Sequence, residues 1–172
     1  INIEFQILIY HGMPKFTYGF NINLYYKNFD LGLVATGAAG QKIVQSYRSW
    51  DSQQANSTTR ILGRWTGEGT SNKIPRVTNQ NINWQFSDLY VQDGDFLRLS
   101  NLTFGYNFAP LMKQKWCSNA RLYFQVQNLY TFTKYDGMDP EIGYGTQAWV
   151  SGVDLGYYPR PRTFLFGVNL AF

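Results

Sequence analysis

Acidic side chains are the clearest candidates for chemistry in this sequence of 172 residues. Asp136, Asp139 and Glu141 stand in the stretch YDGMDPE, and Asp93 and Asp95 flank a glycine in QDGDF. Carboxylate oxygens at such short spacing are ligands that Ca²⁺ prefers. Turns and solvated loops use the same residue types, because Asp and Gly favour turn conformations. We favour the turn and loop interpretation at both places and expect no bound cofactor and no metal.

Residues for the common catalytic sites are missing from these 172 positions. His11 is the single histidine and lies in the atypical segment 1–13. Neither a histidine-based catalytic triad nor a multi-histidine metal site is therefore available. Cys117 is the single cysteine, so an internal disulfide and a CxxC motif are both excluded. No phosphate-binding glycine motif is present. The sequence therefore predicts a protein that is not an enzyme.

Aromatic residues form a second group of candidates, in two long polar stretches at 40–94 and 131–160. Their amphipathic rings suit the apolar faces of sugars or the surface of a partner protein. The alternative, which we prefer, is that they pack the loops against one another. These residues are Trp50, Trp65, Trp84, Tyr144, Trp149, Tyr157 and Tyr158. Arginines of the same stretches are expected to pair with loop carboxylates more often than with a ligand: Arg60, Arg64, Arg76, Arg160 and Arg162.

Composition excludes some partners. The formal net charge is +4 and is not gathered into one basic block, so the sequence gives no sign of a nucleic-acid groove. Aromatic residues make up 18% of the chain and charged residues 15%. No stretch approaches the roughly 18 apolar residues of a transmembrane helix. A membrane role would therefore have to rest on strands.

A period of two runs through KFTYGFNINLYYK. The even positions are apolar and the odd ones small or polar, which is the pattern of a strand with one apolar face. The stretch from Phe16 to Tyr26, at about 3.3 Å per residue, is roughly 35 Å long. Tilted by about 45°, it would cover an apolar band of roughly 25 Å. We predict that Phe16, Tyr18, Phe20, Ile22 and Leu24 face lipid, and that Thr17, Gly19, Asn21 and Asn23 face an interior.

Four further strands follow from the same pattern. A hairpin through Lys27 and Asn28 leads into 29–36, and later strands are expected over 95–108, 120–130 and 163–172. Arg98 and Ser100 share the parity of the apolar positions after them, so we expect the apolar face to hold only over the second half of that strand. The first half is then expected to stand clear of the membrane. INWQFSDLYV at 82–91 is expected to form a short strand of its own.

Short and long connections alternate along the chain. Brief turns at 27–28 and 109–118 alternate with the long stretches at 40–94 and 131–160, which is the layout of outer-membrane barrels. We expect the long stretches on the outer surface and the brief turns in the periplasm. The fold class is thus all-β, an antiparallel transmembrane β-barrel segment of about five or six strands. A soluble carbohydrate-binding β-sandwich is the alternative, and strands and loops of this length argue against it.

Five blocks of the sequence resemble consecutive blocks near the carboxyl end of SusC/RagA-family TonB-dependent outer-membrane transporters. They are PKFTYGFNINLYYKNFDL, RWTGEG followed by IPR, VQDGDFLRLSNLTFGYNF, RLYFQVQNLYTFTKYDGMDPE and YYPRPRTFLFGVNLAF. Residues 1–13 depart from the pattern, because they are apolar where the family usually has a polar loop. The start also lacks the features of a signal peptide. We therefore expect residues 1–172 to be the C-terminal part of a barrel of about 22 strands whose plug domain lies outside this chain.

The resemblance implies a function and partners. It implies the C-terminal barrel portion of a nutrient importer in the bacterial outer membrane, taking up oligosaccharide or peptide with a SusD-like surface lipoprotein. It also implies energy from the TonB complex, through the missing N-terminal part, and insertion by the barrel-assembly machinery. Its assembly signal is expected at Phe164, Phe166, Val168, Leu170 and Phe172. About five strands leave open edges, so transport by this chain alone is not expected. A siderophore receptor or a porin segment remains as an alternative.

Overall fold

The computed structural model describes residues 2–8, 14–46, 59–77, 90–112, 119–142 and 152–171. The strands in these residues are β1 Asn2–Leu8, β2 Phe16–Tyr26, β3 Phe29–Ala39, β4 Lys42–Gln45, β5 Val91–Asp93, β6 Phe96–Asn107, β7 Asn119–Thr133, β8 Val153–Asp154 and β9 Thr163–Ala171. The helical turns are the 3₁₀ helix η1 Thr59–Gly63 and the α-helix α1 Ala109–Met112. Over the described residues, no helix has the length and apolarity needed to cross a membrane.

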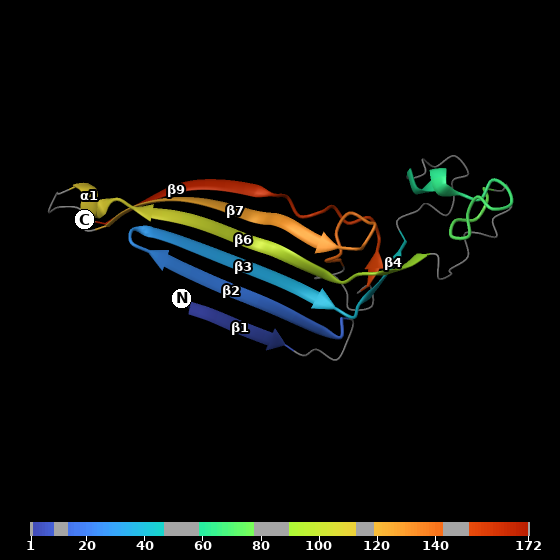
Figure 1. The fold of residues 1–172 in the computed structure, drawn as a ribbon, viewed down its shortest axis with the longest axis horizontal. Coiled ribbons are helices and arrows are strands. Elements are labelled where there is room, and N and C mark those ends of the chain that lie inside the picture. The colour runs from blue at the N-terminus through green and yellow to red at the C-terminus, as the bar shows by residue number, and fades with distance from the viewer. Residues whose placement is uncertain are drawn as a thin grey trace.

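Six strands form one antiparallel sheet in the order β1-β2-β3-β6-β7-β9, which we call the wall (Figure 1). Each strand pairs with the next one along the chain that belongs to the wall. The all-β, antiparallel class and the strand number predicted from the sequence are confirmed. The hairpin turn at residues 27–28 is also confirmed, and Lys27 adopts a left-handed φ of 53° there. Residues 2–8, whose conformation the sequence left open, form the edge strand β1.

The register gives the wall two different faces. One row across five strands is entirely apolar and consists of Ile22, Leu33, Leu102, Val126 and Phe164. The next row lies on the opposite side of the sheet and is mostly small or polar. It consists of Asn23, Gly32, Thr103, Gln125 and Leu165. Neighbours in register share a face of a sheet, and successive residues alternate between faces. We call the two sides the apolar face and the polar face, and the alternation predicted for β2 is confirmed.

A β-bulge corrects one expectation about β6. The pairing shifts between Leu99 and Asn101, so that Ser100 is passed over in the ladder. An extra residue in one strand reverses the parity of the positions beyond it. Leu97 and Leu99 therefore continue the apolar face, and Arg98 lies on the polar face. The prediction that the first half of this strand loses its apolar face was wrong, because it assumed unbroken alternation.

The connections divide between the two ends of the wall. The turn at 27–28 and α1 lie at one end, which we call the turn end, and the C-terminus lies there too (Figure 1). The β4 strand and the described parts of the long connections lie at the other, which we call the loop end (Figure 1). The predicted separation of short turns from long loops is thus confirmed. Which end faces the periplasm stays a prediction.

A second sheet of three strands, in the order β5-β4-β8, stands at the loop end. It continues the pairing of β3 with β6 beyond a break, because β4 follows β3 and β5 precedes β6. Gly40 allows the break with a φ of 76°, a conformation that few residues besides glycine adopt readily. A small apolar cluster, formed by Ile43, Tyr135 and Ile142 with Tyr157 against it, packs beside this sheet. The sequence predicted a strand at 82–91; residues 81–89 lie outside the described residues, and β5 occupies Val91–Asp93.

Candidate functional site

The apolar face of the wall is exposed in this chain. Phe166 is 80% exposed, Phe164 58% and Leu122 51%. A contiguous apolar surface of this kind marks contact with a partner or a membrane. Four residues of the predicted assembly signal lie here on β9, namely Phe164, Phe166, Val168 and Leu170, and the fifth, Phe172, lies outside the described residues.

Aromatic rings gather toward both ends of this face. Near the turn end, Phe29 and Tyr106 have ring centroids 4.6 Å apart, and Lys27 lies over the Tyr26 ring at 5.4 Å. Near the loop end, Tyr130 and Phe132 make an edge contact at 4.7 Å. Aromatic rings toward both ends of an apolar strand face are typical of proteins whose strands cross a bilayer.

The polar face carries an ion pair near the turn end. Arg121 donates from Nε to Asp30 Oδ1 at 2.8 Å and from Nη2 to Oδ2 at 2.5 Å, so the pair is bidentate. Gly105 pairs with Asp30 in the register, and a Cβ there would collide with the side chains of both Asp30 and Arg121. The guanidinium also lies 5.1 Å from the Tyr123 ring. Charged groups therefore occupy the polar face while the opposite side stays apolar.

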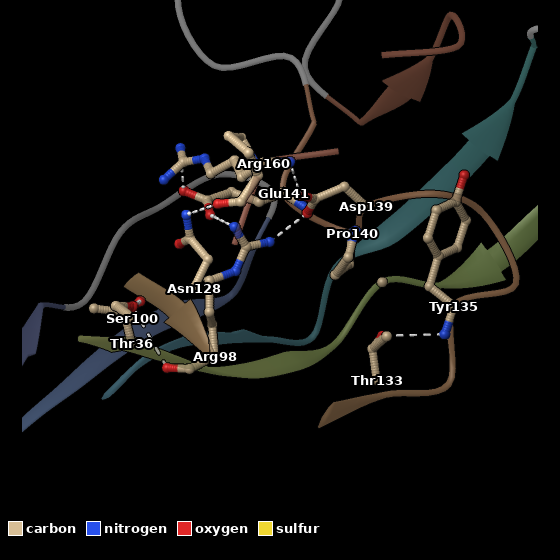
Figure 2. A network of polar contacts seen from close by, with 12 residues as sticks. Thr36, Arg98, Ser100, Asn128, Thr133, Tyr135, Asp139, Pro140, Glu141 and Arg160 are labelled. Carbon is tan, nitrogen blue, oxygen red and sulfur yellow. Dashed lines mark hydrogen bonds and ion pairs between the residues drawn. The ribbon is translucent and has the colours of Figure 1, made fainter. Parts of the chain in front are cut away.

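A group of four charged side chains, two of them buried, ties two loop segments to the wall. We call Arg98, Asp139, Glu141 and Arg160 the Arg98 cluster (Figure 2). Arg98 rises from β6, donates from Nη2 to Asp139 Oδ1, and has its Nη1 3.3 Å from Glu141 Oε2. The Arg98 side chain is 3% exposed and that of Asp139 8%. The charges of Arg98 and Asp139 are both removed from water, so each is stabilised by the opposite charge of the other.

The remaining contacts of the Arg98 cluster reach the segment before β9. Arg160 Nη2 lies 2.8 Å from Glu141 Oε1, and the Arg160 backbone N–H donates to Asp139 Oδ2 at 3.3 Å. The Asp139 carboxylate also accepts a bond of 2.9 Å from the Glu141 backbone N–H. Arg98 thereby holds the segment after β7 and the segment before β9 against the polar face at the loop end.

The acidic residues considered as Ca²⁺ ligands have other partners. Asp139 and Glu141 belong to the Arg98 cluster, so an ion there would have to displace arginine. Within the described residues, no group of three or more His, Cys, Asp or Glu side chains is placed to hold a metal. The loop pairing expected for Arg160 is present in the cluster.

Asp93 and Asp95 stabilise the break between the two sheets. Asp95 Oδ1 accepts bonds from the backbone N–H groups of Gly40 at 2.7 Å and Gln41 at 3.2 Å. Asp93 accepts from Lys42 on the exposed side of β4. The Lys42 hydrogen bond, helped by its charge, lowers the pKa of the Asp93 carboxyl below its ordinary value. These contacts favour the turn interpretation of QDGDF.

Trp65 is the candidate aromatic residue that lines a hollow. The hollow has a volume of about 490 Å³ and lies within the loop segment 59–77. Its lining residues are Trp65, Ser71, Asn72, Lys73, Ile74, Pro75 and Arg76.

The other predicted aromatic residues do not join Trp65. Tyr157 packs against the apolar cluster around Ile43, and Tyr158 is 88% exposed. Trp50, Trp84, Tyr144 and Trp149 lie outside the described residues. The packing of Tyr157 agrees with the loop-packing interpretation that we preferred for this group.

The ion pairs of Arg98 with Asp139 and Glu141 were not predicted from the sequence. The neighbours of Arg98, Leu97 and Leu99, gave a signal, because an arginine between two apolar strand residues must point to the other face. That signal was hidden because the bulge at Ser100 changes which positions of β6, odd or even, lie on the apolar face. The partner Asp139 lies 41 positions away in the chain, and nothing in the local pattern connects the two.

Comparison with known proteins finds TonB-dependent receptors among the relatives of this chain. No protein-family model matches it. The TonB-dependent receptor P3 of Formosa agariphila is 37% identical over 166 residues, which cover 92% of this chain and 16% of the receptor. The TonB-dependent receptor SusC of Bacteroides thetaiotaomicron is 31% identical over 159 residues, which cover 90% of this chain and 15% of SusC.

Solved structures give the same result. The RagAB peptide importer in its open-open state matches with a TM-score of 0.73 and 26% identity over 93% of this chain. The match covers 17% of the importer chain, so this chain spans about one sixth of the length of its relatives. These relatives are named as receptors and importers. The two-faced antiparallel wall and these matches together show that the chain is similar to a barrel segment of the TonB-dependent receptors of the SusC/RagA type.

Proposed function

We propose that this segment forms part of the barrel of an outer-membrane nutrient importer. The importer takes up oligosaccharide or peptide, receives energy from the TonB complex, and works with a SusD-like surface lipoprotein. The observation that carries the proposal is the wall itself, with an apolar face, a polar face, and long connections gathered at one end. Similarity to SusC and to the RagAB peptide importer supports the same function.

Orientation in the membrane gives the first test. Asn28 lies in the hairpin turn at the turn end, and Glu68 is exposed in the loop segment 59–77. We replace each with Cys in the receptor that contains this segment, after changing Cys117 to Ser. A membrane-impermeant thiol reagent is expected to label Glu68→Cys in intact cells and Asn28→Cys only after the outer membrane is permeabilised. The opposite labelling would contradict the proposal.

Energy and partner dependence give the second test. Uptake of a labelled cargo is measured in cells that lack TonB and in cells that lack the lipoprotein encoded with the receptor. Loss of uptake in both strains is expected. Uptake without TonB would favour a porin, and uptake of an iron chelate without the lipoprotein would favour a siderophore receptor.

The β9 strand supports a role in assembly within the same proposal. Its apolar residues alternate on one face up to the end of the strand. We expect that deleting Phe172 reduces the amount of folded receptor in the outer membrane. The melting temperature of the receptor that does insert should change little, because burial of one side chain contributes only about 1.5–3 kcal/mol. Normal insertion with a lowered melting temperature would mean that Phe172 acts only in packing.

A further inference from the structure

The connection between β7 and β9 does not determine how these two strands pair. In β2 and β3 the short turn at residues 27–28 fixes the register, which is the way that tight hairpins work. Residues 134–162 separate β7 from β9, and a connection of that length is compatible with several registers. The register of β9 on β7 therefore depends on contacts between the two strands themselves.

The apolar face at this pair of strands accepts more than one register. Alternation repeats every two residues, so a slip of two residues keeps every side chain on its own face. Phe124 lies opposite Phe166 in the observed register, with ring centroids 4.7 Å apart. After such a slip it would lie opposite Phe164 or Val168, which are apolar too. Apolar pairing therefore does not select one register here.

The polar face distinguishes these registers. Tyr123 lies opposite Gly167, and its ring covers that glycine so closely that a Cβ there would collide with the ring. Glycine leaves this space open because it has no Cβ. After a slip of two residues Tyr123 would lie opposite Leu165 or Asn169, whose side chains would fill the space that the ring occupies. The Tyr123 ring therefore fits the observed register and neither of the slipped ones.

The same row continues across two more strands. Tyr123 also pairs with Gly105 of β6, and Gly105 pairs with Asp30 of β3. Arg121 reaches over Gly105 to its bidentate ion pair with Asp30. The Arg121 guanidinium in turn lies 5.1 Å from the Tyr123 ring. Larger side chains and glycines thus alternate along one row, and we call its members Asp30, Gly105, Tyr123 and Gly167 the Tyr123 row.

We propose that the Tyr123 row fixes the register of β9 on β7 during assembly, and with it the dimensions of the barrel. The number of strands and their stagger together set the tilt of the strands and the diameter of a barrel. The inference rests on the proposed function, because it applies to the closed barrel of the importer. The row lies within sequence blocks that resemble those of the SusC/RagA family, which suits a role in assembly that is independent of the cargo.

Disulfide formation between β7 and β9 measures the register. The receptor that contains this segment is used with Cys117 changed to Ser and without other cysteines. Gln125→Cys with Leu165→Cys reports the observed register, because these two residues lie opposite each other. Gln125→Cys with Thr163→Cys reports a slip of two residues in one direction, and Gln127→Cys with Leu165→Cys reports a slip in the other. Diagonal residues are about 7–8 Å apart, beyond the usual span of a disulfide.

The crosslinks are formed by oxidation in isolated outer membranes, and mass spectrometry measures the linked peptides. We call the yield of the observed pair divided by the summed yield of the two slipped pairs the register ratio. Gly167→Ala and Tyr123→Ala should each lower this ratio about fivefold, which corresponds to about 1 kcal/mol. Tyr123→Phe keeps the ring and should keep the ratio.

Val168→Ala is the matched control in the same strand. It shortens the neighbouring side chain on the apolar face, opposite Leu122, and leaves the Tyr123 row intact. Because apolar pairing does not select the register, this variant should change the register ratio less than about twofold. Equal effects of Val168→Ala and Gly167→Ala would overturn the inference, since the apolar face would then select the register as well.

A double variant separates the row from general damage to the strand. With Tyr123→Ala already present, Gly167→Ala should add less than about a twofold change, because the ring that the new Cβ would displace is gone. If Gly167→Ala alone inserts too poorly for crosslinking, the same comparison is made on the amount of folded receptor, where the double variant should equal Tyr123→Ala. Effects that multiply would overturn the inference, and so would a register ratio that Tyr123→Ala leaves unchanged.

Uptake measurements distinguish this inference from the proposed function. A receptor with TonB-dependent uptake whose register ratio does not respond to Tyr123→Ala overturns this inference alone. Uptake that does not depend on TonB overturns the proposed function, whatever the register ratio.

Discussion

The wall and the loop end of this molecule are stabilised in different ways. In the wall, backbone hydrogen bonds run along every pair of strands, and side chains repeat in rows of similar character. At the loop end, one sheet of three short strands and the chain around it depend on a few polar contacts. Asp95 bridges the break between the sheets, and Arg98 binds two carboxylates in a buried position.

This difference predicts where single substitutions matter. In the wall, the stabilising interactions are many and similar, so a substitution matters chiefly when it places a charge on the apolar face. At the loop end, a substitution matters when it leaves a buried charge without its partner. Exposed pairs at the same end should matter little. The predictions below test this order, from the largest effect to the smallest.

Arg98→Ala should have the largest effect. It leaves Asp139 buried and Glu141 half-buried without the guanidinium that compensates them, and breaking such a pair costs about 3–5 kcal/mol. The measurement is the free energy of unfolding of the receptor in detergent, with urea as denaturant. Arg160→Ala is the matched control, because its side chain is 52% exposed and its loss should cost at most about 1 kcal/mol. Equal losses from the two variants would contradict the ranking.

Ile22→Lys should have the next largest effect. Ile22 lies in the apolar row, and a lysine facing the middle of a bilayer costs about 2–4 kcal/mol. The amount of folded receptor in the outer membrane and its unfolding free energy in lipid both report the loss. Asn23→Lys places the same charge one residue further along on the polar face, and its effect should be much smaller. A comparable loss from Asn23→Lys would show that the two faces have been assigned the wrong way round.

The sequence predicted the wall far better than the loop end, for a physical reason. Alternation is a local signal, so β2, β3, β7 and β9 could be recognised from adjacent residues. The bulge at Ser100 changed the parity of the apolar positions in β6, and under unbroken alternation such a change is interpreted as the loss of an apolar face. The Arg98 cluster and the hollow beside Trp65 depend on which distant segments meet. Residue types alone marked Trp65 as a candidate but did not connect Arg98 with Asp139.

Asp95→Ala should have a moderate and local effect. It removes the acceptor of the Gly40 and Gln41 backbone N–H groups, and losing bonds of this kind at an exposed site costs about 1 kcal/mol. Hydrogen exchange should become faster in β4 and β5, while the amides in the middle of β2 and β3 keep their protection. Faster exchange throughout the wall would mean that the two sheets unfold as one unit.

Asp93→Asn should have the smallest effect, although Asp93 is only two residues from Asp95. Its carboxylate pairs with Lys42, but their side chains are 57% and 59% exposed, so water and salt screen the attraction. The pKa of the Asp93 carboxyl is lowered in the folded protein by the Lys42 hydrogen bond, in strands outside the wall. A lowered pKa means that the stabilisation is present at neutral pH and is lost as the pH falls below the ordinary value near 3.8 and through the lowered one. Asp93→Asn should therefore leave the urea midpoint at pH 7 unchanged within error, and any small difference should vanish in high salt or in acid. A loss at pH 7 that equals that of Asp95→Ala and persists in high salt would show that exposed pairs also stabilise the loop end.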